Sequence, residues 1–171
     1  SRFNGGEITV ENSKCEDSVN IIRSSGYINK LKITNSFSDG ADFDFSKLEI
    51  KNITVENSGN DCADFSYGNY TVSNATFINC GDKAVSVGEK SKLKLKDFKI
   101  NKTSYGIVSK DSSNVSVVNG QIENNQNFCL GSYNKKQEFN GGYLEYINIS
   151  CDNKILYSDL NSKLVVLSNE K

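Results

Sequence analysis

The chain has 171 residues, of which 36% are hydrophobic, and its 20 basic and 21 acidic side chains leave a net charge of −1. This length suits one domain with a lean core, and the balanced charge gives no reason to expect a nucleic acid or an anionic membrane surface as a partner. No apolar run approaches the roughly 18 residues that span a bilayer, so membrane insertion is not expected. Methionine is absent, also at position 1, which indicates a fragment of a larger protein with flanking domains.

Short segments of alternating apolar residues follow one another along the chain, separated by Asn, Gly and Ser. Such alternation predicts short β-strands. No stretch has the i, i+3, i+4, i+7 spacing of an amphipathic helix. The clearest segments are Leu48-Glu-Ile50, Ile53-Thr-Val55, Ala84-Val-Ser-Val87, Leu93-Lys-Leu95 and Val115-Ser-Val117.

An internal repeat of about 22 residues organises these strands. NSFSDGADF at 35–43 aligns without a gap with NSGNDCADF at 57–65, 22 positions later. Three short strands and three turns in one repeat form a coil of a solenoid, and only neighbouring coils can bury its apolar side chains. The same steps of 22 or 23 relate Ile50, Val72, Leu95 and Val117, and also Val55, Phe77, Ile100 and Ile122.

Equivalent residues of stacked coils lie about 4.8 Å apart, so each repeat position forms a ladder. Phe43 and Phe65 are expected to stack inside the solenoid. Asparagines at one corner can bond to the next coil and to the turn backbone. This asparagine ladder contains Asn12, Asn35, Asn57, Asn79 and Asn124, with Lys102 interrupting it.

The cysteines are odd in number, and the chain has no CxxC pair and no histidine. A structural zinc is therefore not expected. We expect small buried hydrophobes rather than a disulfide framework, since free cysteine is among the most buried residue types. The positions are Cys15, Cys62, Cys80, Cys129 and Cys151.

The repeat resembles the right-handed parallel β-helix of pectate-lyase-like proteins. This resemblance implies an all-β, single-stranded right-handed parallel β-helix of about six or seven coils, each about 22 residues long. The coils cover about residues 8–151, and residues 152–171, which include Leu164-Val-Val-Leu, are expected to form the last coil or a C-terminal cap.

A finer resemblance concerns the aspartates. Polygalacturonase-type glycoside hydrolases carry an NTD motif, a DD motif one coil later and a GHG motif one coil beyond. Ser38-Asp39-Gly40, Asn60-Asp61-Cys62 and Gly81-Asp82-Lys83 are similar to these motifs in place. Asn60 replaces the first Asp of DD and Lys83 the histidine, so the resemblance implies a degenerate site. Its candidate catalytic residues are Asp39, Asp61, Asp82 and Lys83.

A lyase or epimerase acting on a uronic-acid polymer is a second catalytic hypothesis. Such chemistry removes a proton beside a carboxylate, with a Lys, Tyr or His as base and a cation or arginine as clamp. Besides Lys83, the candidate substrate-binding residues are Lys110, Tyr67 and Tyr105.

The aspartate column also has readings that involve no catalysis. Adjacent carboxylates repel, and turn N–H donors, a neighbouring lysine, solvent or a bound calcium ion would each relieve this. Calcium is the one cofactor that this column suggests. The column contains Asp17, Asp39, Asp61 and Asp82, and Asp42, Asp44 and Asp64 would add oxygen ligands if they face outward.

These observations favour a carbohydrate-associated or cell-surface module that binds or positions a polysaccharide, exported or at the cell surface. The alternatives are a polysaccharide hydrolase, lyase or epimerase, and a purely structural solenoid. For the last, the GDKAxSxGExS stretch at 81–91 resembles β-helix segments of large bacterial surface and spore-coat kinase-like proteins.

Overall fold

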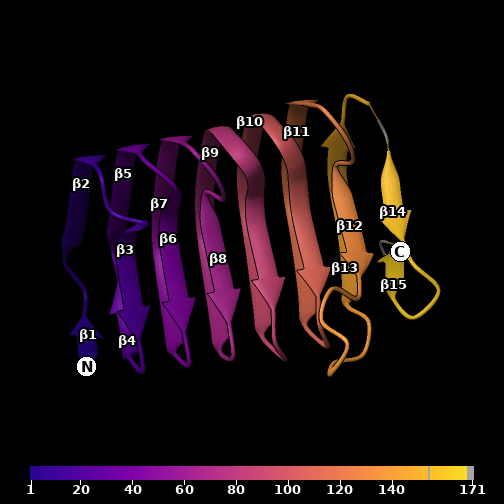
Figure 1. Cartoon of the computed structure of the whole chain (residues 1–171), viewed down its shortest axis with the longest axis horizontal. Helices are drawn as coiled ribbons and strands as arrows, with labels where there is room; N and C mark the ends of the chain where they lie inside the picture. The colour runs from indigo at the N-terminus through magenta and orange to yellow at the C-terminus, as the bar shows by residue number, and fades with distance from the viewer. Residues whose placement is uncertain (154, 169–171) are drawn as a thin grey trace.

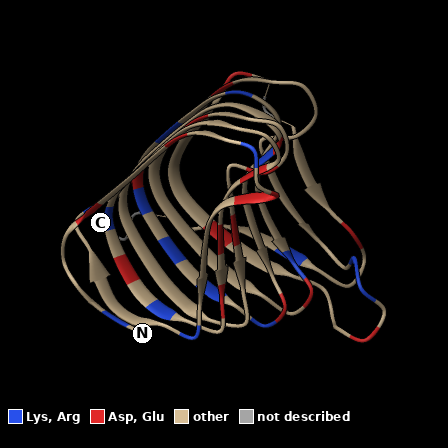
Figure 2. Ribbon diagram, turned by 60° about the vertical axis from the view of Figure 1, so that its left-hand side comes forward, with Lys and Arg blue, Asp and Glu red and all other residues tan. Residues whose placement is uncertain are grey.

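The chain winds into a parallel β-solenoid of about seven turns in a computed structural model that describes residues 1–153 and 155–168 (Figure 1). The coils stack along the long axis around a common interior (Figure 2). All strand pairs are parallel, for example β7 with β9 and β9 with β10. The predicted all-β parallel solenoid is confirmed. Its strands are β1 (Arg2–Asn4), β2 (Glu7–Ser13), β3 (Asp17–Ile22), β4 (Ser25–Ile28), β5 (Lys30–Ser36), β6 (Asp39–Asp44), β7 (Lys47–Ser58), β8 (Ala63–Ser66), β9 (Asn69–Gly88), β10 (Lys92–Lys110), β11 (Asn114–Asn125), β12 (Leu130–Tyr133), β13 (Tyr143–Cys151), β14 (Leu156–Ser158) and β15 (Lys163–Val166).

No helix in the described part of the chain has the length and apolar character needed to cross a membrane.

One side of the solenoid is made by β3, β6, β8, the C-terminal ends of β9 and β10, β12 and β14. We call its outer surface the β6–β8 face. Long strands such as β9 and β10 bend around corners and so contribute to more than one side. Beyond β12, β14 and β15 continue the parallel pairing, with β12 and β13 respectively. The segment after residue 152 therefore adds a partial coil.

The interior is filled by the apolar residues of the alternating strands. Phe43 and Phe65 are 0% and 1% exposed, and their rings stack with centroids 4.9 Å apart. The Tyr70 hydroxyl donates hydrogen bonds to the carbonyls of Phe43 (2.8 Å) and Ser66 (2.9 Å), which satisfies the polar end of this buried ring. The predicted internal phenylalanine stack is thus present.

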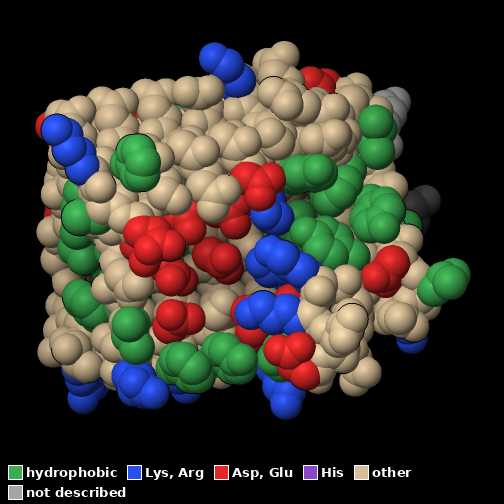
Figure 3. Space-filling view, in the orientation of Figure 1, with side chains coloured by type: hydrophobic (Ala, Val, Ile, Leu, Met, Phe, Trp, Pro, Cys, Tyr) green, Lys and Arg blue, Asp and Glu red, His purple; other side chains and the backbone are tan. Residues whose placement is uncertain are grey.

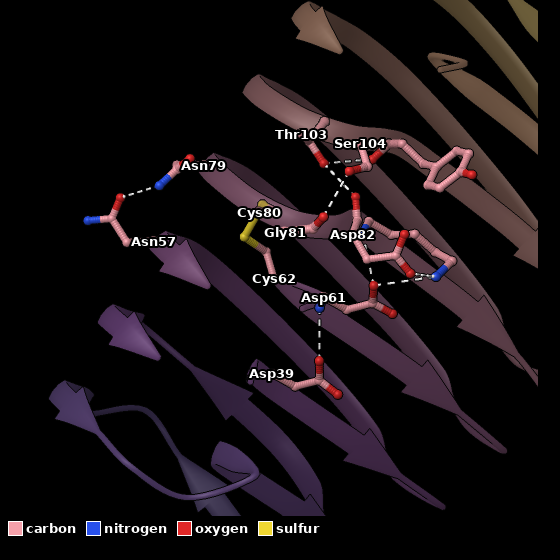
Figure 4. Close-up of a disulfide and its surroundings, with 12 residues drawn as sticks. Asp39, Asn57, Asp61, Cys62, Asn79, Cys80, Gly81, Asp82, Thr103 and Ser104 are labelled. Carbon is pink, nitrogen blue, oxygen red and sulfur yellow. Dashed lines mark hydrogen bonds and ion pairs between the residues drawn. A yellow bond between two sulfur atoms is a disulfide. The ribbon is translucent and has the colours of Figure 1, made fainter. Parts of the chain in front are cut away.

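The asparagine ladder forms one corner of the solenoid. Asn12, Asn35, Asn57 and Asn79 all have left-handed backbones, with φ of 56°, 60°, 61° and 58°. Asparagine tolerates this conformation better than most residues. The amides of Asn35, Asn57 and Asn79 each donate to the side-chain oxygen of the asparagine one coil earlier, at 2.8–2.9 Å. Figure 4 shows the bond from Asn79 to Asn57. Lys102, which interrupts the ladder, keeps the left-handed backbone (φ 62°).

The expectation of small, buried free cysteines is wrong, because four of the five form disulfides and the fifth, Cys15, is exposed. Cys62 pairs with Cys80 and Cys129 with Cys151, with Cα atoms 5.5 and 6.3 Å apart, and Cys15 is free and exposed. The paired residues are 18 and 22 positions apart in sequence, close to one coil. Stacking brings residues about one coil apart next to each other, so cysteines at these separations could have been predicted to form disulfides.

Candidate functional site

The β6–β8 face carries a cluster of charged side chains, several of them buried or with shifted pKa values. Acidic side chains cluster over β3, β6 and β8, lysines lie beside them, and hydrophobic side chains lie beyond the lysines (Figure 3). The acidic residues are Asp17, Asp39, Asp42, Asp44, Asp61, Asp64, Asp82 and Glu89, and the lysines are Lys83, Lys110 and Lys136.

Asp39 and Asp61 hold successive coils together at one edge of this face (Figure 4). Asp39 Oδ1 accepts hydrogen bonds from the Asp61 backbone N–H (2.8 Å) and from Asn60 Nδ2 (2.7 Å). Asp61 Oδ1 accepts one from the Lys83 backbone N–H (2.9 Å), and Asp61 is only 4% exposed. Burial still raises the pKa of Asp39, although the bonds from Asp61 and Asn60 oppose this. Both carboxylates therefore have a turn-capping role.

Lys83 continues this column, and its ammonium lies between two carboxylates. Lys83 Nζ is 3.4 Å from Asp61 Oδ1 and forms a close ion pair with Asp82 Oδ2. Burial alone would lower the pKa of Lys83, but the charges of Asp61 and Asp82 outweigh it and raise the pKa above its usual value. Lys83 is therefore protonated at neutral pH, which does not suit the base of a lyase. The structure brings Asp61, Asp82 and Lys83 together, with Asp39 one coil away.

Asp42, Asp44 and Asp64 point outward in the middle of the face, because the adjacent Phe43 and Phe65 point into the core and successive side chains of a strand alternate. Asp42 and Asp64 are register partners on β6 and β8. Burial, followed by the charges of Asp44 and Asp64, raises the pKa of Asp42 to about 7. Burial raises the pKa of Asp64 to about 6, against the lowering effect of Lys110. The sequence left open whether these aspartates face outward.

Lys110 reaches into this cluster across Gly88. A Cβ on Gly88 would lie 3.0 Å from Lys110 Cε, so the glycine leaves room for the lysine chain. The Lys110 side chain is 7% exposed, and its Nζ is 3.9 Å from Asp64 Oδ2. Within the described residues Lys110 Nζ donates no hydrogen bond, and Asp64 Oδ1 is enclosed without a partner.

Glu89 and Lys136 belong to the same face, although the sequence did not predict either of them as a site residue. The buried Glu89 carboxylate accepts a hydrogen bond from Ser66 Oγ (2.6 Å) and forms a close ion pair with Lys136. Burial would raise the pKa of Glu89, but these two partners lower it overall. Lys136 comes from the loop between β12 and β13, which Asp111 Oδ1 anchors by accepting the backbone N–H groups of Lys135 and Lys136 (both 2.7 Å).

Exposed aromatic rings lie at one edge of the face. Tyr67 stacks on Phe45, with ring centroids 4.6 Å apart and planes 3° apart, and the two residues are 43% and 48% exposed. The Arg23 guanidinium lies over Phe45, 5.2 Å from the ring centroid, and Phe139 meets Tyr67 edge-on at 6.3 Å. Tyr67, predicted as a substrate-binding residue, is therefore available to a ligand.

A second aromatic cluster lies at the opposite edge, where Tyr105 is the register partner of Lys83. Phe128 is 4.7 Å from Tyr105 and 5.4 Å from the exposed Tyr157, centroid to centroid. With Tyr133, these rings line a groove of about 240 Å³ that we call the aromatic groove. Asn134 and Asp159 add polar groups to its wall. The predicted site residue Tyr105 thus belongs to a concave surface.

A larger concavity, about 630 Å³, lies on a different side of the solenoid, over β4, β7, β9 and β10. Arg2, Lys47 and Lys92 line it, and Glu49 is its acidic residue. It has no pair of carboxylates, and the cationic side chains of its rim are exposed. Its lysines fit a solvated strand surface, and the clustered carboxylates with raised pKa values lie on the β6–β8 face instead.

Among the residues that the structure describes, no group of three or more His, Cys, Asp or Glu side chains is arranged to hold a metal ion.

A family model described as a right-handed β-helix region matches residues 2–144. No curated protein and no solved structure matches the chain.

Proposed function

This chain belongs to the right-handed β-helix family, and we propose that its β6–β8 face binds a neutral polysaccharide. One observation carries the proposal: exposed aromatic rings lie at both edges of a face whose central carboxylates accept no hydrogen bond within the described part of the chain. Asp42 and Asp64 accept no hydrogen bond from the described residues. The rings are the Phe45–Tyr67 stack and the aromatic groove.

Exposed aromatic rings beside carboxylates suit the two kinds of surface that a sugar has, its apolar ring face and its hydroxyl groups. The apolar face of a pyranose ring packs on an aromatic ring, and its hydroxyl groups donate to accessible carboxylates. Charge-assisted hydrogen bonds of this kind are roughly twice as strong as neutral ones. The face therefore offers stacking at its edges and hydroxyl acceptors between them.

The charge of the face supports a neutral polymer over a uronic-acid polymer. Two like charges 4 Å apart repel by about 4 kcal/mol at an effective dielectric constant near 20. A polyuronide carries a carboxylate on each sugar and would meet the carboxylates of Asp44 and Asp64. Lys83 and Lys110 are already beside carboxylates of the protein, so they offer little compensation.

The disulfides support an exported protein. Disulfides persist in oxidising compartments and are rare in the cytosol. Cys62–Cys80 and Cys129–Cys151 both form within the solenoid. This agrees with a module that meets its polysaccharide outside the cell.

Affinity electrophoresis against glucans, mannan, xylan and galactan tests the proposal. Tyr67→Ala and Tyr157→Ala each remove an exposed ring of the face. Each should weaken binding roughly tenfold, which corresponds to about 1.4 kcal/mol. Salt should change the affinity little, because stacking and hydrogen bonding to a neutral ligand are not screened.

Tyr27→Ala is the matched control, because Tyr27 is also exposed (39%) but lies beside the larger concavity. Its binding should equal that of the unmodified chain. Failure to bind every neutral polymer would favour a purely structural solenoid, and an equal loss in Tyr27→Ala would move the site away from this face.

A further inference from the structure

The Asp42 and Asp64 carboxylates form an unequal pair. They are register partners on neighbouring parallel strands, and both point outward. Lys110 Nζ, on an almost fully buried side chain, is 3.9 Å from Asp64 Oδ2. Asp42 instead has the carboxylates of Asp44 and Asp64 around it. One member of the pair therefore has a cation beside it and the other has only anions.

This asymmetry separates two chemical roles. A positive neighbour favours the ionised form of a carboxyl group, and negative neighbours favour the protonated form. Asp64 is thus suited to be an anion and Asp42 to carry a proton. Burial raises the pKa of both carboxyl groups, that of Asp42 to about 7 and that of Asp64 to about 6, and of the two only Asp64 has a lysine that opposes the rise.

We propose that Asp42 and Asp64 hydrolyse glycosidic bonds of the bound polysaccharide with retention of configuration, Asp42 as general acid and base and Asp64 as nucleophile. This inference rests on the proposed polysaccharide site. The residues differ from the Asp39, Asp61, Asp82 and Lys83 set of the polygalacturonase resemblance, whose carboxylates are engaged by backbone N–H groups and by the lysine.

The spacing of the pair favours retention. Neighbouring strands lie about 4.7–4.9 Å apart, so in-register side chains begin at about this distance. Carboxylates of retaining glycosidases are about 5–5.5 Å apart, whereas inverting enzymes need about 6.5–9.5 Å to admit a water molecule. The strand spacing thus starts the Asp42 and Asp64 side chains nearer to the separation in retaining enzymes than to that in inverting enzymes.

The reaction then has two steps. Asp64 Oδ2 forms a bond to the anomeric carbon while the glycosidic C–O bond breaks, and Asp42 gives its proton to the departing oxygen. Water next attacks the anomeric carbon, Asp42 takes its proton back from that water, and the Asp64 carboxylate leaves. One water is consumed for each bond cleaved, and no oxidant or reductant takes part.

Lys110 is a positioning residue in this scheme. Its ammonium donates no hydrogen bond to the described residues and stabilises the Asp64 anion. The enclosed Asp64 Oδ1, which has no partner, leaves this anion poorly solvated and so more nucleophilic. Other charged groups face the pair from neighbouring elements, namely Asp17 on β3, Asp39 and Asp44 on β6, Asp61 before β8, Glu89 after β9 and Lys136 in the loop before β13.

The test combines cleavage and binding on the whole chain. Oligosaccharides of the polymers that bind are incubated with the protein, and proton NMR records the anomer that appears first. We expect the retained anomer. Asp42→Asn and Asp64→Asn should each lower kcat by about 10²–10⁴-fold while binding persists. Asp97→Asn, at a corner away from this face, should leave cleavage unchanged.

Lys110→Met tests the role of the lysine through the pH profile of kcat, which would not change if Lys110 had only a structural role. Removing the cation should raise the pKa of the Asp64 nucleophile and shift the acidic limb of the kcat profile to higher pH, with binding preserved. Lys110→Arg should restore most of the original profile.

The outcomes separate the two proposals. Binding without cleavage, cleavage that survives both aspartate substitutions, or a product of inverted configuration would overturn the catalytic pair and leave the binding site standing. Absence of both binding and cleavage would overturn both proposals.

Discussion

Replacing Asp42 by Asn should stabilise the protein at alkaline pH. The pKa of Asp42 is raised from 3.8 to about 7 by burial and by the charges of Asp44 and Asp64. The native state therefore binds this proton more tightly than the unfolded state does. The stability that this group contributes is complete below pH 3.8 and is lost as the pH rises through about 7.

The size of the effect follows from the shift. A change of about three pKa units corresponds to about 4 kcal/mol, at about 1.36 kcal/mol per unit. Asp42 is only partly buried, and solvent screens its interactions, so about 1–2 kcal/mol is the realistic expectation. Because Asn cannot ionise, the variant should exceed the parent in stability by this amount near pH 8 and match it near pH 4.

Urea unfolding at several pH values between these limits measures the difference. Asp97→Asn removes one exposed charge at a corner and keeps a side chain suited to its left-handed backbone (φ 55°), so it should stay within about 0.5 kcal/mol throughout. A stability difference for Asp42→Asn that does not grow with pH, or that has the opposite sign near pH 8, would refute the account of this carboxylate.

Two further predictions concern the scaffold. Replacing Cys62 and Cys80 together by Ala should lower the free energy of unfolding by about 3 kcal/mol, the value expected for a bond between residues 18 positions apart. Cys15→Ala should change the stability little, because Cys15 is free and exposed. Equal denaturation midpoints for the double variant and the parent chain would contradict the bond. Asn57→Ala should lower the free energy of unfolding by about 2 kcal/mol, because alanine disfavours the left-handed backbone and both ladder hydrogen bonds of Asn57 are lost. Asn57→Gly loses the same bonds but should cost about 1 kcal/mol less, because glycine accepts a φ of 61°. Equal melting temperatures for the two Asn57 variants would contradict the backbone argument.

The repeat made the fold predictable, because its signals are local and recur. The alternating residues around Ile50 and Val55 define strands, and a step of 22 or 23 places each residue above its equivalent. The ladder at Asn35 and Asn57 follows from the same step. The disulfides were not predicted because free and paired cysteines look alike in a sequence, and their separations of 18 and 22 residues indicate bonds only when they are compared with the 22-residue repeat.

The candidate site was only partly predictable. The Asp-Phe-Asp pattern at 42–44, with Phe43 inside, indicates that Asp42 and Asp44 face away from the core, but it does not show how far these carboxylates are buried. Glu89 and Lys136 meet because a loop two coils further along folds back over the face, and no local signal encodes this contact. The burial of Lys110 depends on the missing side chain of Gly88 one coil earlier, which is visible only in the register.

The most direct test of the central claim is an NMR titration of the chain with an oligosaccharide of a neutral polymer that it binds. The account predicts shift changes for the amides of β6 and β8, around Tyr67 and along the aromatic groove, with none around Tyr27. Shift changes confined to the surface around Lys47 and Lys92, or none at saturating oligosaccharide, would contradict it.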